Sequence, residues 1–443
     1  MTAANTSPAL VASWLRYTGS IDELPFDARR ALLARTTESA SSVVAEAARI
    51  IADVRARGDS ALFDMARQFD SVELETLEVP RVAMTRALDD APPLLRRAME
   101  RAARNIGAVH RAFMPSTVEI ESEPGIIIGR RPDALQRVGV YAPGGRASYP
   151  SSVLMGAIPA RVAGVGEIVL CSPPDRSGLP PSAVLAAATL AGVDRVFAVG
   201  GAGAIAAMAL GTESVPRVDR IVGPGNAYVA AAKLLLVGDV AIDSPAGPSE
   251  LLIVADDSAD PDGVALEMVA QAEHDPSACV IALALGDGVA DAIERALVSA
   301  AAATPRRDVV ARALTGQGGV LRADSIESAI DFANEYAPEH LLLDIRNPDA
   351  SLPRVRNAGT VFLGATSSVT FGDYMTGANH VLPTGGAARA YSGLSPLDFV
   401  RWTTYQRVDD NAARRLADDV ARFATAESLF GHAAAARRWS AEP

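Results

Sequence analysis

The strongest chemical feature of this sequence is an acid next to an imidazole. Glu339 and His340 are consecutive and stand directly before an apolar run typical of a strand. A carboxylate next to an imidazole at the edge of a sheet can hold a general base ready to accept a proton. The alternative is an ordinary polar pair at the end of a surface helix. The choice depends on which other polar groups the fold brings to this pair.

A second pair of polar residues lies at the end of a predicted helix. Asp260 suits the N-cap, Pro261 suits the first helical position, and Pro276 would stop the helix. Gln271 and His274 are three residues apart, so we expect both on one face of the last turn. An amide oxygen and an imidazole nitrogen at this spacing can bind one metal ion. The alternative is a capped helix end with a solvated histidine.

Two further stretches offer metal ligands. Asp373 and His380 lie in a glycine-rich, polar run that lacks a long apolar stretch, which predicts a functional loop rather than a core element. Glu427 and His432 follow a helix near the C-terminus, and a break at Gly431 would be needed to bring them together. Amide, imidazole and carboxylate donors suit Zn²⁺ or Mn²⁺. The sequence has no C-x-x-C or H-E-x-x-H pattern, which excludes a thiolate zinc site and the helical zinc-protease site.

Two glycine-rich turns follow predicted strands and begin helices. Residues 201–206 fit the pattern G-x-G-x-x-A, and residues 223–226 read Gly-Pro-Gly-Asn. Such turns can present backbone N–H groups and a helix N-terminus to the pyrophosphate of a dinucleotide. Asp219 stands before a strand rather than at the end of one, so the dinucleotide pattern is imperfect and an ordinary tight turn is the alternative. The absence of G-x-x-x-x-G-K-[ST] excludes a P-loop.

Length and composition predict an α/β protein with more than one domain. The 443 residues are 49% hydrophobic and 21% charged, too many residues for one core. A net charge of −12 offers no basic surface to nucleic acid or an anionic membrane. No apolar run is long enough to span a membrane and no signal peptide is visible, so we expect a cytoplasmic protein. Cys171 and Cys279 lie in strand-like runs and are expected to be reduced core thiols.

Strand-like runs alternate with helical segments through most of the chain, which predicts βαβ units and parallel sheets. We therefore predict two Rossmann-like parallel-sheet domains plus small helical N- and C-terminal segments. The predicted divisions are an N-terminal helical segment 1–35, a larger domain made of 36–137 and 249–394, a second domain 138–248, and a helical tail 395–443.

Motifs along most of the chain resemble those of histidinol dehydrogenases. The resemblance spans roughly residues 35–435, in the same order. Its motifs are Val138–Gly145, Tyr149–Met155, Gly223–Val229, Pro245–Glu250, Gln271–Asp275, Pro338–Leu341 and Asn379–Thr384. The resemblance implies oxidation of L-histidinol through L-histidinaldehyde to L-histidine with NAD, in the last step of histidine biosynthesis. It also implies one Zn²⁺ per subunit and a homodimer whose tails cross over to complete the partner's active site.

The resemblance assigns roles to particular residues. By it, the zinc ligands are Gln271, His274, Asp373 and His432, and the catalytic pair is Glu339 and His340. The implied substrate contacts are Ser249, Gln271, His274, His340, Asp373, His380, Glu427 and His432. The implied cofactor contacts are Tyr141, Asn226 and position 203. The family commonly has glutamine where this chain has Gly203, which puts the cofactor contact at that position in doubt.

The implied reaction requires two hydride transfers with an aldehyde between them. In our hypothesis His340 removes the alcohol proton, Glu339 activates the water that hydrates the aldehyde, and His340 acts again in the second oxidation. One alternative is a related zinc and NAD dehydrogenase of another small polar alcohol, such as a sulfonated diol. Glu427 argues against that alternative, because a carboxylate suits an ammonium and repels a sulfonate. Another alternative is a non-catalytic ligand-binding protein, which the presence of both Glu339 and His340 disfavours.

Overall fold

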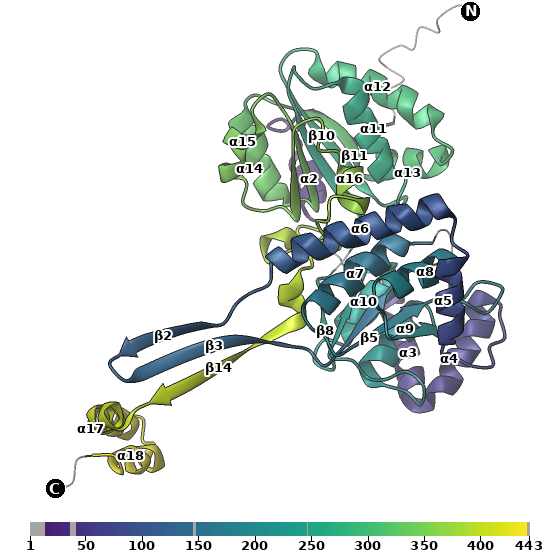
Figure 1. Ribbon diagram of the computed structural model, residues 1–443. Helices are drawn as coiled ribbons and strands as arrows, with labels where there is room; N and C mark the ends of the chain where they lie inside the picture. Colours follow the sequence, from purple (N-terminus) through teal and green to yellow (C-terminus); the bar gives the residue numbers. More distant parts are fainter. Residues whose placement is uncertain (1–13, 36–40, 145–147, 246, 441–443) are drawn as a thin grey trace, which may run out of the picture.

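Two parallel sheets, each covered by helices on both faces, form the body of the protein (Figure 1). The computed structural model describes residues 14–35, 41–144, 148–245 and 247–440. The first residues of the predicted segments 1–35 and 36–137 lie outside these described residues, as do the last three of the predicted tail.

The larger sheet has six parallel strands. Their order across the sheet is β1 (Tyr17–Ser20), β11 (Gly318–Ala323), β10 (Cys279–Leu285), β9 (Glu250–Ala255), β12 (His340–Asp344) and β13 (Thr360–Leu363). One face is covered by α11 (Pro261–Ala272), α12 (Val289–Ala303), α13 (Arg307–Gln317) and α16 (Val369–Tyr374). The other face is covered by α2 (Phe26–Leu33) and α14 (Ile326–Tyr336). Since both faces are buried, the central strands are continuous apolar runs rather than alternating ones.

The smaller sheet has five parallel strands in the same relative order. They are β6 (Arg195–Ala198), β5 (Glu167–Ser172), β4 (Arg137–Tyr141), β7 (Arg220–Val222) and β8 (Ala241–Ile242). One face packs on α5 (Arg81–Asp89), α6 (Pro93–Ala112), α7 (Pro150–Val162) and α8 (Ser182–Leu190). The other packs on α3 (Ser41–Arg57), α4 (Asp59–Met65), α9 (Gly201–Leu210) and α10 (Ala227–Leu235), and α4 continues into a π-helix, Ala66–Asp70. The strand order reverses at β9 in the larger sheet and at β4 in the smaller one, and doubly wound folds bind ligands at such reversals.

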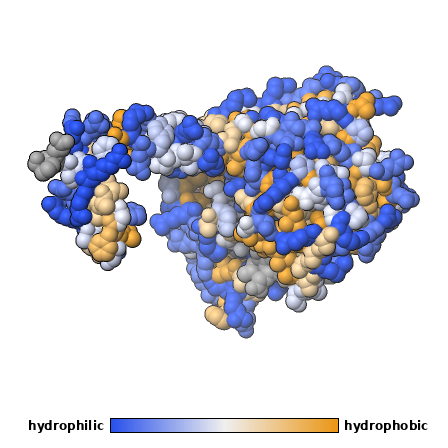
Figure 2. All heavy atoms as spheres, turned by 90° about the horizontal axis from the view of Figure 1, so that it is seen from below, coloured by the Kyte–Doolittle hydropathy of each residue, from blue (hydrophilic) through white to orange (hydrophobic). Residues whose placement is uncertain are grey.

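A long arm joins the body to the C-terminal helices. It is an antiparallel sheet of β14 (Val400–Val408), β3 (Ile126–Ala134) and β2 (Val118–Glu123). The arm ends in α17 (Asp410–Ala426) and α18 (Phe430–Arg437), which stand clear of both parallel sheets (Figures 1 and 2). The remaining short helices are α15 (Pro348–Ser351), Leu352–Arg354, Ala387–Arg389 and Pro396–Phe399.

The predicted fold class is confirmed, but three parts of the predicted organisation differ from the structure. The segment 1–35 contains a strand, β1, which extends the six-stranded sheet. Helices α3 to α6 of the segment 36–137 pack on the five-stranded sheet, not on the sheet of residues 249–394. The tail 395–443, predicted to be helical, includes strand β14 before helices α17 and α18. Each difference arises from packing between segments far apart in sequence, which no local pattern reports.

Two smaller observations complete the fold. Cys171 and Cys279 are buried in β5 and β10 and form no disulfide. Among the described residues, no helix combines the length and the apolar character needed to cross a membrane.

Candidate active site

Glu339 and His340 meet Glu250 at the edge of the six-stranded sheet where β9 and β12 begin. These neighbouring strands place Glu250 and His340 at their first positions. The backbone N–H of Glu250 donates to Oε2 of Glu339 at 2.7 Å, and Nδ1 of His340 lies 2.9 Å from the backbone oxygen of Glu250. The main chain of one residue therefore holds both members of the acid–imidazole pair. The predicted pair is a buried unit, with side chains 7% and 5% exposed, and not a surface pair.

The contact between His340 and Glu250 fixes the tautomer of the imidazole. A backbone carbonyl can only accept a hydrogen bond, so Nδ1 of His340 must carry the proton in this contact. Nε2 is then the nitrogen with a free lone pair when the ring is neutral. It points toward the carboxylate of Asp373, with 3.6 Å between Nε2 and Oδ1. This arrangement leaves His340 able to accept a proton through Nε2.

A buried ion pair with Arg35 fixes the side chain of Glu250. Nε of Arg35 lies 2.9 Å from one carboxylate oxygen of Glu250 and Nη2 lies 3.2 Å from the other. The guanidinium also donates to the backbone oxygens of Leu32 and Tyr336 and lies 3.2 Å from the centre of the Tyr336 ring. The backbone N–H of Gly385 donates to the same Glu250 carboxylate at 2.8 Å. Since the two ionic side chains are 4% and 2% exposed, this pair is a rigid support for the acid–imidazole unit.

Helices α11 and α16 lie together and bring three predicted metal donors to this edge. Oε2 of Glu267 in α11 accepts the backbone N–H of Val369, the first residue of α16. Gln271 is buried near the end of α11, whereas His274 lies two residues beyond that end and is exposed. Asp260 caps α11 as predicted, but the helix ends at Ala272, so His274 is held by a further turn through its N–H to the backbone oxygen of Gln271 at 3.3 Å.

Asp373 lies in helix α16 and not in a loop, which corrects the prediction for this stretch. Gly372 makes this possible, because any Cβ there would lie 2.6 Å from the Phe362 ring of β13. The main-chain oxygen of Asp373 accepts from Nδ1 of His380 at 2.8 Å, so these two predicted residues are together. Val381, which follows His380, is buried in a core cluster, although its stretch was predicted to contribute no core.

The titratable groups of this cluster strongly affect one another. Burial would raise the pKa of Asp373, but three neighbouring imidazoles outweigh it and the pKa is lowered. These imidazoles belong to His340, His380 and His274. Burial would lower the pKa of His340, but the charges of Glu339 and Asp373 outweigh it and raise the pKa well above the ordinary value. Burial raises the pKa of Glu339 and lowers that of His380.

The predicted residues of the tail lie apart from this cluster. Glu427, in the turn after α17, and His432, in α18, are exposed at the end of the arm, whose helices Figure 1 shows. The predicted break between them exists, but it falls at Ser428, which has a positive φ of 61°, and Gly431 is helical. In the described part of the chain, no three His, Cys, Asp or Glu side chains are grouped closely enough to hold a metal ion. One chain thus brings together His274 and Asp373, holds Gln271 buried in the last turn of α11, and leaves His432 elsewhere.

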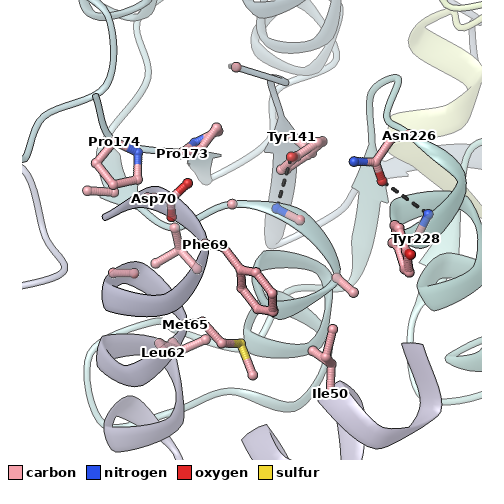
Figure 3. Close-up of a pocket in the computed structure, with 18 of the residues that line it drawn as sticks. Ile50, Leu62, Met65, Phe69, Asp70, Tyr141, Pro173, Pro174, Asn226 and Tyr228 are labelled. Carbon is pink, nitrogen blue, oxygen red and sulfur yellow. Dashed lines mark hydrogen bonds between the residues drawn. The ribbon is translucent and has the colours of Figure 1, made fainter. Parts of the chain in front are cut away.

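A cavity of about 500 Å³ opens at the carboxyl-terminal edge of the five-stranded sheet (Figure 3). Tyr141 at the end of β4, the turn 200–203 before α9, and Asn226 before α10 all line it. The backbone N–H of Gly201 donates to the Tyr141 hydroxyl at 3.0 Å, which fixes the turn against the strand. Burial raises the pKa of Tyr141 to about 12. The three predicted cofactor positions therefore share one cavity at the point where the strand order reverses.

Asn226 serves as the N-cap of α10. Its side-chain oxygen accepts from the backbone N–H groups of Tyr228 at 3.1 Å and Val229 at 3.2 Å. Its amide nitrogen consequently points away from the helix, on the side of Tyr141 (Figure 3). Gly203 also lines the cavity, and a Cβ added there would approach the sulfur of Met65 to 2.8 Å. In this chain Met65 fills the space beside position 203.

The sequence alone did not identify three parts of the site. Arg35 and Glu250 support the acid–imidazole pair, and sequence reasoning assigned Glu250 no role beyond its place in the motif Pro245–Glu250 at the head of an apolar strand. Asp70, from the π-helix, faces the cavity, where burial raises its pKa to about 6.

Ser249, a predicted substrate contact, directly precedes Glu250 and is half-buried, with its backbone oxygen bonded to the N–H of Cys279 at 3.0 Å.

Comparisons with known proteins identify related chains. The family model described as histidinol dehydrogenase matches residues 33–439. A histidinol dehydrogenase of Natronomonas pharaonis is 48% identical over 417 residues, covering 94% of this chain and 97% of that relative. One from Methanosarcina mazei is 45% identical over 385 residues, covering 87% of this chain and 89% of the relative. The crystal structure of histidinol dehydrogenase from Elizabethkingia anophelis is similar with a TM-score of 0.91 at 36% identity, covering 96% of this chain and 98% of that one.

Proposed function

The chain belongs to the histidinol dehydrogenase family and is an oxidoreductase of histidine biosynthesis, and on that premise we propose how its residues oxidise histidinol. We propose that NAD binds in the cavity beside Tyr141 and Asn226, and that Glu339 and His340 perform the acid–base steps. We also propose that one zinc ion per subunit binds beside Asp373, and that two copies of the chain complete each other's sites.

In the proposed mechanism His340 accepts the alcohol proton at Nε2 while hydride passes to the cofactor. The Nδ1–H bond to the backbone oxygen of Glu250 makes Nε2 the proton acceptor of the neutral ring. The aldehyde formed is hydrated before the second hydride transfer: the Glu339 carboxylate takes a proton from the attacking water, and the protonated His340 returns its proton to the carbonyl oxygen, which leaves the imidazole neutral again. His340 then accepts the proton of the hydrate as the carboxylic acid forms. The buried position of both side chains favours retention of the reactive aldehyde until it is oxidised.

Zinc fits the donors found at this edge of the sheet. Amide, imidazole and carboxylate groups of Gln271, His274 and Asp373 are ligands that zinc accepts, and the buried amide of Gln271 lies close to the end of the helix that leads to His274. When bound, zinc supplies positive charge that can hold the substrate's amine and imidazole and offset the Asp373 carboxylate. The substrate's reacting carbon would then be fixed beside His340. His380, bonded to the main chain of Asp373, is proposed to contact the substrate.

A dinucleotide fits the features of the cavity. Its wall includes the N-terminus of α9, where first-turn backbone N–H groups other than that of Gly201 can bind a phosphate. Gly200 lets the turn pack against Pro173, since a Cβ at Gly200 would lie 2.7 Å from Cβ of Pro173. Tyr141 and Asn226 are proposed to contact the cofactor. At position 203 we propose contact through the main chain alone, because glycine has no side chain to replace the glutamine of related enzymes.

A second copy of the chain is the proposed partner of the tail. Large apolar side chains are exposed on α17 and α18, with Phe423 74% and Phe430 67% exposed. The only buried cluster between these helices consists of three alanines, too few to stabilise the pair alone. Figure 2 places apolar atoms on the surface of this projecting tail. We propose that Glu427 and His432 enter the partner's site, where Glu427 accepts a hydrogen bond from the substrate's amino group and His432 completes the zinc ligands.

The observation that supports the proposed chemistry best is that Glu250 holds both catalytic side chains through its main chain. The test is an assay of purified protein with L-histidinol and NAD⁺, following NADH by absorbance and products by chromatography. We expect two NADH and one L-histidine for each L-histidinol consumed. Release of aldehyde after one NADH would contradict the two-step mechanism, and no NADH would contradict the proposed activity.

The alternative, a dehydrogenase of another small polar alcohol, is not favoured, because the similar chains reported above all carry the name histidinol dehydrogenase. The same assay with a sulfonated diol in place of L-histidinol separates the two functions. We expect no NADH from the sulfonated diol, since the carboxylate of Glu427 would repel its sulfonate.

A further inference from the structure

Lys233 is the only lysine in the sequence, which has 40 arginines. Its side chain is 4% exposed, and it extends from α10 toward the turn that precedes that helix. Surface positions exchange lysine and arginine readily, but a buried, closely contacted position does not. The one place where this sequence uses lysine is therefore a place where a compact ammonium has a particular task.

The ammonium of Lys233 and the carboxylate of Asp243 hold the two sides of one glycine. Nζ of Lys233 donates to the backbone oxygen of Gly223 at 2.9 Å. Oδ2 of Asp243 accepts the backbone N–H of Gly223 at 2.8 Å, and the two side chains form an ion pair with each other. The Asp243 side chain is 7% exposed, so the whole arrangement is shielded from water. A buried ion pair keeps its geometry because water cannot replace either charged group as the partner of the other.

Gly223 needs such support, because its backbone conformation is one that other residues rarely adopt. Its φ is +119°, and a Cβ at this position would lie 2.2 Å from the backbone oxygen of Tyr141. The close contact puts the turn directly against the end of β4. A glycine in this conformation is free to move unless its peptide groups are bound. Lys233 and Asp243 bind both of them.

The turn held in this way leads into the cavity. Gly223 follows β7, and three residues later Asn226 caps α10 and lines the cavity with Tyr228. Lys233 belongs to the same helix, so its bond to Gly223 ties the body of α10 to the start of the turn. Asp243 follows β8 and ties the turn to the edge of the sheet. Neither charged side chain lines the cavity itself.

We propose that Lys233 and Asp243 are positioning residues for the nucleotide cofactor, which hold the Gly223–Asn226 turn at the distance from Tyr141 that binding requires. This inference rests on the proposed placement of NAD in the cavity. The ammonium suits the task better than a guanidinium, because a single compact donor can reach the Gly223 oxygen and Asp243 together within a buried space.

Steady-state kinetics of Lys233→Met and Asp243→Asn test the proposal. We expect the KM for NAD⁺ to rise about tenfold, as for the loss of one hydrogen bond to a charged group, with kcat at saturating NAD⁺ and the KM for L-histidinol unchanged within about twofold. Calorimetric titration with NAD⁺ should show the same tenfold rise in Kd without turnover. Lys233→Arg should weaken NAD⁺ binding as well, although it keeps the positive charge. An unchanged KM and Kd for NAD⁺ in folded variants would overturn the proposal.

Asn226→Ala separates failure of this inference from failure of the proposed cofactor site. If Asn226→Ala weakens NAD⁺ binding and the Lys233 and Asp243 variants do not, the positioning role is wrong and the cofactor site stands. If none of the three variants changes NAD⁺ binding, the proposed cofactor site is wrong as well.

Chemical labelling of the unaltered enzyme provides a measurement that no folding defect can obscure. The terminal amine and Lys233 are the only amines that an acetylating reagent can convert to a stable amide in this chain. We expect Lys233 to be acetylated at least tenfold more slowly in the native enzyme than in urea, and more slowly again with saturating NAD⁺. Rapid acetylation of Lys233 in the native enzyme, unaffected by NAD⁺, would contradict a closed ion pair beneath the cofactor turn.

Discussion

Replacing Arg35 by methionine tests how the acid–imidazole pair is supported. The change removes two hydrogen bonds to Glu250, two to backbone oxygens and the contact with the Tyr336 ring. It also leaves the Glu250 carboxylate buried, at 2% exposure, without its cation. Breaking a buried ion pair on one side costs about 3–5 kcal/mol. We expect Arg35→Met to lower the free energy of unfolding by this amount, measured by urea denaturation.

A double-mutant cycle separates the ion pair from the other contacts. Glu250→Gln alone should cost about 3 kcal/mol, but Arg35→Met combined with Glu250→Gln should cost about 2 kcal/mol less than the two single effects together, since no unpaired charge remains. Arg29→Met is the matched control, because its ion pair with Glu335 is 34% and 47% exposed and should contribute at most about 1 kcal/mol. Additive effects in the cycle would refute the argument. The argument would also be refuted if Glu250→Gln kept both the wild-type kcat and the wild-type free energy of unfolding.

Three further predictions concern single side chains. His340→Ala should abolish NADH formation while the bound zinc, measured by atomic emission after purification, stays at the wild-type level. Tyr141→Phe should raise the KM for NAD⁺ about fivefold, because the N–H of Gly201 loses its acceptor at 3.0 Å and one neutral hydrogen bond contributes about 1 kcal/mol. Burial lowers the pKa of His110 from 6.5 to about 4. Between these pH values the unfolded chain binds a proton at His110 that the folded chain does not bind, so the free energy of unfolding decreases as the pH falls from 6.5 to 4. That loss should be about 3 kcal/mol and absent from His110→Gln, measured as unfolding free energy against pH.

Much of the body could be predicted because its strands are buried on both faces. Runs such as 251–254 and 279–283 have no alternation, and the helices between them begin at recognisable caps such as Asp260. Strand β1 was missed, since only four residues pair with β11 and their composition is mixed. Strand β14 was missed for a different reason. Most of its residues are half-buried or exposed on the arm, so its pattern resembles a polar surface segment.

The parts of the candidate site that could be predicted are those whose functional residues are neighbours in the sequence. The neighbouring residues Glu339 and His340 and the turn at Asn226 could be read directly. The support from Arg35 could not, because it reaches Glu250 across more than two hundred residues and its type is common in this chain. Lys233 was visible in the sequence as the single lysine, but its task depends on a contact with Gly223 that only the fold provides.

The central claim is that each active site joins His340 of one chain to His432 of the other. Two differently tagged chains can be co-expressed and the mixed dimer purified through both tags. With His340→Ala on one chain and His432→Ala on the other, we predict about half of the wild-type activity, because one site keeps both histidines. With both substitutions on one chain and a wild-type partner, we predict none. The reverse result, activity only in the second dimer, would show that each tail serves its own chain and would contradict the account.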